Sequence, residues 1–311
     1  MPYFSVIIPL YNKEKHIKNT VESVLAQSFD DFEIVVVDDG STDNGLEIIN
    51  SLKDKRLKVF PKKNQGAAQA RNSAIEKASS ENIALLDADD IWQPNHLEEL
   101  HNSIQKFPEA SLFCNAYNLK LDDGFTHKAT YNIPETDQIQ IIDDYFKASI
   151  IHPIAWTSAV GFKKTDFNEI GGFDPKVLSG QDIDLWIKFA LQKTIVFNPE
   201  VTTCYNKTID NSLSKGNYRK SKCDLFNSYR QEEKKNPSLK KYLDLNRYSL
   251  AIQCKYFNDG EVLKKLKNQI DLNSLNSKQK LLLSLPNFMT GQLKKFQSFL
   301  IKNDIYLTAF K

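Results

Sequence analysis

The sequence predicts an α/β fold in which helices cover both faces of a mostly parallel sheet. Over the first hundred residues, short apolar runs rich in β-branched residues alternate with longer segments whose apolar residues recur at helical spacing. This alternation is typical of strand–helix units that build parallel sheets. The chain has 311 residues, of which 41% are hydrophobic. That is enough for one large domain with a real core plus an extension, or for two domains.

The first four strands and three helices follow from local patterns. Residues 14–27 place Ile17, Val21 and Val24 on one helical face, and residues 32–37 form a mainly β-branched run that reads as a buried strand. The first strand ends at Pro9. The expected series comprises strands at 4–9, 32–37, 57–60 and 83–86, and helices at 14–27, 43–53 and 66–77.

The rest of the chain divides into a mixed part and a helical part. Between about 110 and 214 we expect strands at 112–117 and 159–162, a hairpin turn at 122–124, helices at 134–150 and 182–192, and a loop at 171–175. Beyond Gly216 the chain is Lys-rich, and we expect helices at 217–235, 237–257, 259–270 and 277–303. We therefore expect an α/β domain over 1–214 and a basic helical region over 215–311.

The two parts carry opposite charge. Residues 1–214 contain 21 Lys and Arg against 31 Asp and Glu, whereas residues 215–311 contain 20 against 8. A basic region can contact nucleic acid, an anionic membrane surface or an acidic partner. No nucleic-acid-binding motif is present, so we expect no nucleic acid. The open alternatives are packing on the acidic domain, a homodimer contact, or peripheral docking on the membrane.

Cysteine usage and hydropathy indicate the compartment. The four cysteines are widely spaced and include no CxxC pair, which favours free thiols in a reducing compartment. No segment approaches 18 uninterrupted apolar residues, and no stretch has the form of a signal peptide. We expect a cytoplasmic protein, with the inner face of the cytoplasmic membrane as the surface for any peripheral contact.

The most informative motif is the acidic run Leu85-Leu-Asp-Ala-Asp-Asp90. Three carboxylates at the end of an apolar strand repel one another unless a cation is present. Mg2+ prefers one or two carboxylates together with substrate phosphates. Alone, the run is more simply a solvated acidic turn that caps the helix expected after Trp92, with Asp90 as the local cap. The sequence therefore predicts a metal site only in combination with other motifs.

Further polar groups follow the other strands. Asp39 comes after the second strand and can accept a hydrogen bond from a nucleobase or ribose, although Ser41 and Asp43 could simply cap the next helix. Tyr11 follows the first strand and can stack on a base or pack locally. Gly66–Asn72 opens a helix with small residues, where backbone N–H groups and Arg71 would attract an anion.

A last acidic segment begins the helix expected at 182–192. Asp182 lies at its N-terminus, where the helix dipole favours a carboxylate, so it is either a base or a dipole-compensating residue. Asp184 cannot share its helical face and is taken as structural. His152, Trp156 and the Thr157-Ser158 pair could line a sugar pocket, or they could be packing residues.

Four motifs in this order resemble glycosyltransferase family 2 with the GT-A fold. They are Val6-Ile-Ile-Pro-Leu-Tyr-Asn12, Val35-Val-Val-Asp-Asp-Gly-Ser-Thr-Asp43, Leu85-Leu-Asp-Ala-Asp-Asp90, and Gly171-Gly-Phe-Asp174 followed by Gly180-Gln-Asp182. The resemblance covers residues 3 to about 214. It implies a three-layer α/β/α catalytic domain of the GT-A type. It also implies an inverting transfer from a nucleoside diphosphate sugar to a hydroxyl of a saccharide or lipid-linked saccharide acceptor, in bacterial surface glycan assembly.

The resemblance also implies roles for individual residues. Asp182 would be the general base. Asp89 would bind Mg2+ or Mn2+ at the donor diphosphate. The donor nucleotide would be held by Pro9, Tyr11, Asp39, Arg71, Asp87 and Ala88. The acceptor or sugar pocket would include Trp156, Thr157, Gly172 and Gln181.

The chain departs from the family pattern in two places. Many relatives carry Glu before the catalytic Asp, where this chain has Gln181, and many carry an Arg and a His near Ser212-Leu-Ser214. The second departure leaves a second protein ligand to the metal in doubt. The Gln-x-x-Arg-Trp motif of processive synthases is absent, which favours transfer of a single sugar.

Two other functions remain open. A sugar-nucleotide nucleotidyltransferase would need a Gly-rich basic loop after the first strand, where this chain has Tyr11-Asn-Lys-Glu14. A non-catalytic nucleotide-sugar-binding module would bind donor normally when Asp182 is replaced, because it has no activity to lose.

Overall fold

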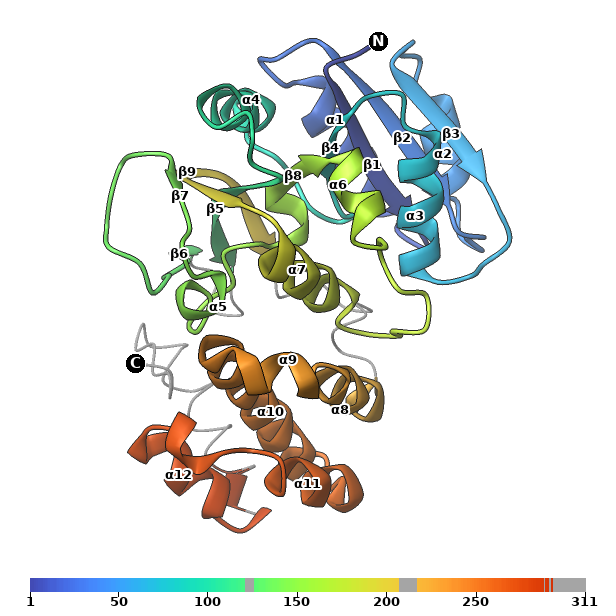
Figure 1. Cartoon of the computed structure of the whole chain (residues 1–311). Coiled ribbons are helices and arrows are strands. Elements are labelled where there is room, and N and C mark those ends of the chain that lie inside the picture. The colour runs from blue at the N-terminus through green and yellow to red at the C-terminus, as the bar shows by residue number, and fades with distance from the viewer. Residues whose placement is uncertain (121–125, 207–216, 288, 291, 293–311) are drawn as a thin grey trace.

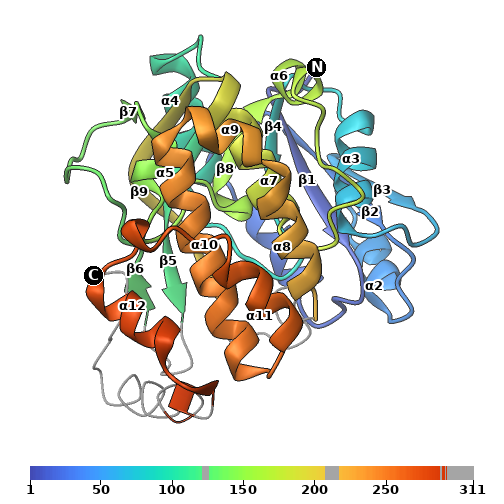
Figure 2. The same ribbon diagram turned by 60° about the horizontal axis from the view of Figure 1, so that its bottom comes forward.

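The computed structural model is a nine-stranded mixed sheet covered by helices, with a further group of helices at one end (Figures 1 and 2). It describes all residues except 121–125, 207–216, 288, 291 and 293–311. The turn expected at 122–124, the segment around 212–214 and the end of the helix expected at 277–303 lie outside the described residues.

The sheet places β3, β2, β1 and β4 in parallel and then changes direction. Its order is β3-β2-β1-β4-β8-β5-β9-β7, with β6 paired to β5, and β8 is antiparallel to both of its neighbours. The strands are β1 (Phe4–Leu10), β2 (Phe32–Asp38), β3 (Leu57–Pro61), β4 (Asn82–Leu85), β5 (Leu112–Lys120), β6 (Thr126–Lys128), β7 (Gln140–Ile141), β8 (Val160–Lys163) and β9 (Ile195–Asn206).

Alternate residues of the strands supply two apolar layers. In β1, Val6 and Ile8 pack on one face against α1 (Ile17–Leu25), α2 (Gly45–Ser51) and α4 (His96–Lys106). Ile7 faces the other layer, with α3 (Ala67–Lys77), α5 (Tyr145–Ala148), α6 (Lys164–Glu169) and α7 (Gln181–Gln192). The expected α/β fold with helices on both faces is confirmed.

The C-terminal helices pack on the second layer. They are α8 (Arg219–Ser228), α9 (Arg230–Lys235), α10 (Pro237–Tyr256), α11 (Gly260–Lys267) and α12 (Ser277–Ser284). Leu239 and Tyr242 of α10 belong to the same buried cluster as α5 and α7, and the three helices lie together in Figure 2. Part of the basic region is therefore buried against the helices of the α/β domain.

Several expected elements differ from the structure. The helix expected over 134–150 is wrong, because only residues 145–148 are helical and 140–141 pair with β9. Asp144 caps the short helix by accepting a hydrogen bond from Lys147 N. The helix then buries Tyr145 and Phe146. The helix expected over 217–235 is two helices that meet at Tyr229. The sequence patterns missed α6, β6, β7 and β9.

Two expectations of composition can be compared directly with the structure. All four cysteines are free. In the part of the chain that the structure describes, no helix is long and apolar enough to span a membrane.

Candidate active site

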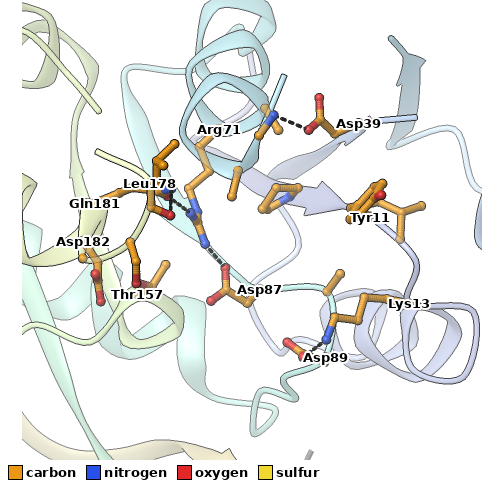
Figure 3. A pocket seen from close by; sticks show the side chains of 18 of the residues that line it. Tyr11, Lys13, Asp39, Arg71, Asp87, Asp89, Thr157, Leu178, Gln181 and Asp182 are labelled. Atoms are coloured by element: carbon orange, nitrogen blue, oxygen red, sulfur yellow. Dashed lines mark hydrogen bonds and ion pairs between the residues drawn. The ribbon is translucent and has the colours of Figure 1, made fainter. Parts of the chain in front are cut away.

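A cavity of about 690 Å³ lies beyond the carboxyl ends of β1, β2 and β4 (Figure 3). Parallel strands bring the loops that follow them to one edge of the sheet, so motifs far apart in the sequence meet there. The cavity is lined by segments 9–13, 64–71 and 87–90, by Asp39, and by segments 156–157 and 178–183. Tyr205, Tyr218 and Lys222 complete the wall.

Two aspartates of the acidic run each bond to a cation. Asp87 Oδ1 accepts a hydrogen bond from Arg71 Nη2 at 2.5 Å, and Asp89 Oδ2 accepts one from Lys13 Nζ at 2.6 Å. Figure 3 shows the two pairs side by side in the pocket. Each carboxylate is partly exposed, 30% for Asp87 and 17% for Asp89, so each can also reach a ligand in the cavity.

Asp90 differs from its two neighbours. It is buried, and its Oδ2 lies 2.6 Å from the Ser158 hydroxyl, which donates to it. Burial raises the pKa of the Asp90 carboxyl well above its ordinary value, and the nearby charges of Asp87 and Asp89 raise it further. The sequence suggested a local helix cap for Asp90. This is wrong, because Asn95 is the residue that precedes α4.

Asp39 organises the opposite end of the pocket. Its two carboxylate oxygens accept hydrogen bonds from Gln65 N at 3.0 Å and Gly66 N at 2.8 Å, and Lys62 Nζ lies 3.3 Å away. Gly66 has φ +90°, a conformation that glycine adopts without strain. Tyr11 lies beside this end with 47% of its surface exposed. An exposed ring next to a buried carboxylate suits a flat heterocycle with N–H groups.

Arg71 joins the two ends. It is 8% exposed, and its Nη1 donates to Gln181 Oε1 at 3.3 Å while its Nη2 donates to Asp87. Burial alone would lower the pKa of Arg71, but the charges of Asp87, Asp182 and Asp89 raise it overall. The guanidinium therefore stays charged in the middle of the pocket.

Asp182 lies at the start of α7, on the side of Arg71 away from Tyr11 (Figure 3). The helix begins after Gly180, which has φ +85° and accepts the first helical hydrogen bond, from Asp184 N. Burial raises the pKa of the Tyr242 hydroxyl on α10, and the nearby charge of Asp182 raises that pKa further. Asp182 thus faces the cavity with the C-terminal helices behind it.

Asp184 has a structural role, as expected. It is buried, lies 2.6 Å from Lys188 Nζ, and accepts a hydrogen bond at 2.6 Å from the hydroxyl of Tyr229. Tyr229 separates α8 from α9, so this carboxylate ties the C-terminal helices to α7.

All predicted site residues except Gly172 line the cavity. Gly172 has φ +62°, and a Cβ built there would lie 2.9 Å from Phe167 Cζ. Glycine is therefore needed for the turn and for the close contact with Phe167, not for the pocket. Trp156 and Thr157 are buried at 9% and 4% exposure and form part of the wall.

The sequence patterns missed Lys13, Tyr205, Tyr218 and Lys222. Lys13 follows Tyr11 in the loop after β1, so its position at the rim could have identified it. The Ser158 hydroxyl holds the acidic run in place, because it donates to Asp90 Oδ2 and accepts a hydrogen bond from Asp87 N at 3.0 Å. No local pattern marks Tyr218 or Lys222, because α8 reaches the pocket only through tertiary packing.

Comparison with known proteins identifies relatives of most of the chain. Residues 5–171 match the family model described as glycosyl transferase family 2. A Bacillus subtilis protein named as a teichuronic acid biosynthesis glycosyltransferase, TuaG, is 30% identical over 236 residues, which cover 75% of this chain and 89% of that protein. The glycosyltransferase GlyG of Streptococcus pneumoniae is 40% identical over 123 residues, 39% of this chain and 41% of that protein. The matched stretch therefore spans less than half of GlyG.

Solved structures share the fold at low sequence identity. S. aureus TarS (residues 1–349), in complex with UDP-GlcNAc, has a TM-score of 0.69 and 20% identity, covering 98% of this chain and 93% of that one. The mannosyltransferase PcManGT of Pyrobaculum calidifontis, in complex with GDP-Man and Mn2+, has a TM-score of 0.57 and 19% identity, covering 96% and 81%. The fold shared with these two structures extends over nearly the whole chain.

Proposed function

We propose, from the premise that this chain belongs to glycosyl transferase family 2 and is a glycosyltransferase, that it moves one sugar from a nucleoside diphosphate sugar to an acceptor hydroxyl with inversion. The observation that carries the proposal is that one cavity holds Asp182 on one side of Arg71 and Asp87 with Asp89 on the other. A displacement reaction needs a base for the attacking hydroxyl and cationic stabilisation for the departing diphosphate, and this cavity holds groups for both.

The nucleoside would lie between Tyr11 and Asp39. The exposed ring of Tyr11 offers a stacking surface, and Pro9 lines the wall beside it. The Asp39 carboxylate already accepts two backbone hydrogen bonds but retains lone pairs for a base N–H. Asp87 and the backbone of Ala88 would contact the ribose, and the diphosphate would lie over Arg71 and Asp89.

The donor set fits a divalent cation that completes its shell with the diphosphate. Asp89 and Asp87 supply carboxylate oxygens, and no group of three or more His, Cys, Asp or Glu side chains among the described residues gathers to hold an ion alone. Mg2+ is commonly bound in this way, by one or two carboxylates and substrate phosphates. When bound, Mg2+ or Mn2+ would act as a Lewis acid on the leaving diphosphate.

Asp182 would remove the proton from the acceptor hydroxyl as that oxygen attacks the anomeric carbon. The diphosphate leaves from the opposite face, so a single displacement inverts the anomeric configuration. Arg71 keeps a fixed positive charge beside the leaving group, and its hydrogen bonds to Asp87 and Gln181 hold it there before the reaction. Trp156 and Thr157 would form the wall of the sugar pocket.

The acceptor is proposed to be a bacterial cell-surface polysaccharide or its lipid-linked precursor, made at the inner face of the membrane. The name of TuaG, with its teichuronic acid biosynthesis, supports this process. Single transfer, a cytoplasmic location and peripheral contact with the membrane are parts of the same proposal.

A donor panel tests the first half of the reaction. The protein is mixed with UDP-, GDP- and dTDP-sugars, with and without Mn2+, and its unfolding temperature is measured. We expect one nucleoside series to raise the unfolding temperature and Mn2+ to increase that rise, because a ligand that binds only the folded state stabilises it. If no nucleotide sugar has any effect, the proposed donor site is wrong.

Replacing the base separates an enzyme from a binding module. In Asp182→Asn we expect donor affinity within about twofold of wild type and transfer reduced by roughly 10²–10⁴-fold, the usual contribution of a general base. Asp224→Asn, an exposed aspartate on α8, is the matched control and should keep full transfer. Undiminished transfer by Asp182→Asn would remove Asp182 from the mechanism.

A further inference from the structure

The basic helical region contributes two side chains to the wall of the pocket. Tyr218, which caps α8, and Lys222, one helical turn later, both line the cavity together with Asp182. Lys222 N donates to Tyr218 O at 3.0 Å, so the two residues lie on the same side of the helix. Residues that follow the domain resembling the family therefore form part of the active site.

The backbone that carries Lys222 is held firmly against the turn before Asp182. A Cβ built at Gly180 would lie 3.1 Å from Leu225 Cδ2 and 4.0 Å from Lys222 Cγ, so α8 packs directly on this turn. Leu225 is buried, and the Tyr229 hydroxyl at the end of α8 donates to Asp184 of α7 at 2.6 Å. The aliphatic stem of Lys222 thus packs on the segment that carries Asp182.

Lys222 differs from the other cations of the pocket wall. Lys13 pairs with Asp89 at 2.6 Å, and Arg71 pairs with Asp87 at 2.5 Å. Within the described residues, Lys222 makes no ion pair with a carboxylate. A half-buried lysine that no described carboxylate pairs with is available to bind a negative charge that enters the cavity.

We propose that Lys222, with Tyr218 beside it, binds an anionic group of the acceptor, a phosphate or a carboxylate. The inference rests on the proposed function, because the acceptor is the substrate whose hydroxyl reaches Asp182. The donor diphosphate is the other anion that could enter, but Arg71 and Lys13 already provide its cations. Figure 3 shows Lys13 with Asp89 on the side of Arg71 opposite Asp182.

Inorganic phosphate is the probe for this site. The full-length protein is saturated with UDP and Mg2+ to fill the donor site, and phosphate binding is followed by the width of its 31P resonance. We expect Lys222→Gln to weaken phosphate binding by about tenfold or more, because it removes a charge-assisted hydrogen bond. Lys222→Arg should restore most of the binding. Lys220→Gln, an exposed lysine on the same helix, is the matched control and should bind phosphate as wild type does.

The affinity for UDP distinguishes the two sources of the anion. We expect UDP to bind Lys222→Gln and wild type equally, which also shows that the variant is folded. A parallel loss of UDP affinity would place Lys222 on the donor and overturn the inference. Phosphate binding that is equal in Lys222→Gln, Lys220→Gln and wild type would overturn it as well. Failure of every nucleotide to bind the wild-type protein would instead contradict the proposed function.

Discussion

At the scale of single residues, the ion pair between Lys13 and Asp89 affects the proposed binding of a divalent cation before the substrate arrives. The ammonium lies 2.6 Å from Asp89 Oδ2, on one of the oxygens that a metal would use, and both side chains are largely buried. Lys13 therefore competes with a divalent cation for this carboxylate. An entering diphosphate offers Lys13 another anionic partner and leaves Asp89 for the cation.

Lys13→Met should tighten Mn2+ binding to the nucleotide-free protein. Removing the ammonium leaves Asp89 uncompensated, and we expect the affinity for Mn2+ to rise by roughly tenfold. Electron paramagnetic resonance of free Mn2+ in a titration measures this directly. Lys15→Met, an exposed lysine in the same loop, is the control. Equal Mn2+ affinity in the two variants would show that Lys13 does not compete.

Sequence patterns identified the acidic residues of the site but not their partners. Asp39, Asp87 and Asp89 each follow a strand of the parallel sheet, so that sheet was enough to bring them to one rim. Asp182, at the start of α7, was placed there only by the family resemblance. Lys13 and Asp89 are 76 positions apart and meet only because β1 and β4 are neighbours. Such contacts depend on strand order, which local patterns do not encode.

At the scale of elements, Glu33 links three strands at the start of the sheet. It lies within the apolar β2 and accepts hydrogen bonds from Ser5 of β1 at 2.5 Å, from Lys58 of β3 at 2.6 Å, and from Ser79. Burial alone would raise the pKa of Glu33, but these hydrogen bonds together lower it to about 2. The charged form therefore stabilises the parallel pairing.

Glu33→Gln should lower the free energy of unfolding by at most about 3 kcal/mol at pH 7. This upper limit is the free energy that corresponds to the lowering of the Glu33 pKa. The folded pKa lies below the unfolded one, so this stabilisation is complete above about pH 4.5 and is lost as the pH falls toward 2. The difference between wild type and variant in urea unfolding should shrink over that window. Glu47→Gln, exposed on α2, is the control. A difference that does not change with pH would contradict the assignment.

Elements with strong local periodicity were predicted correctly, and those defined by tertiary pairing were not. β1 to β4 and α1 to α3 appeared close to their expected bounds because each has a clear apolar pattern. β9 contains Asn198-Pro-Glu200 and pairs with β5 through register shifts near Ala116, so it has no regular alternation to detect. Residues 134–150 resemble a helix in sequence, but the cap at Asp144 starts one only near the end.

At the scale of the whole molecule, the basic helices form part of the catalytic unit. Their buried residues share one apolar cluster with α5 and α7, and α8 reaches the pocket. A deletion of residues 215–311 would therefore expose core residues such as Tyr145 and Phe146, whose rings lie against Tyr242 of α10. Membrane docking has to be tested on the full chain.

Three exposed lysines of α11, at 264, 265 and 267, test the membrane contact. If this helix docks on an anionic surface, the full chain should float with phosphatidylglycerol vesicles and not with phosphatidylcholine vesicles. Changing all three lysines to Gln should reduce flotation by roughly tenfold or more. The control changes three exposed lysines of the α/β domain, at 53, 55 and 63, to Gln. Equal flotation of both variants would exclude α11 as the docking surface.

The buried state of Asp90 has a consequence for how a nucleotide approaches. Burial raises the pKa of Asp90 well above its ordinary value, so the charged form of this aspartate is disfavoured. The remaining charges cancel locally, Asp87 against Arg71 and Asp89 against Lys13. A diphosphate that enters the pocket thus meets two carboxylates that already have cationic partners, instead of an unpaired acidic run.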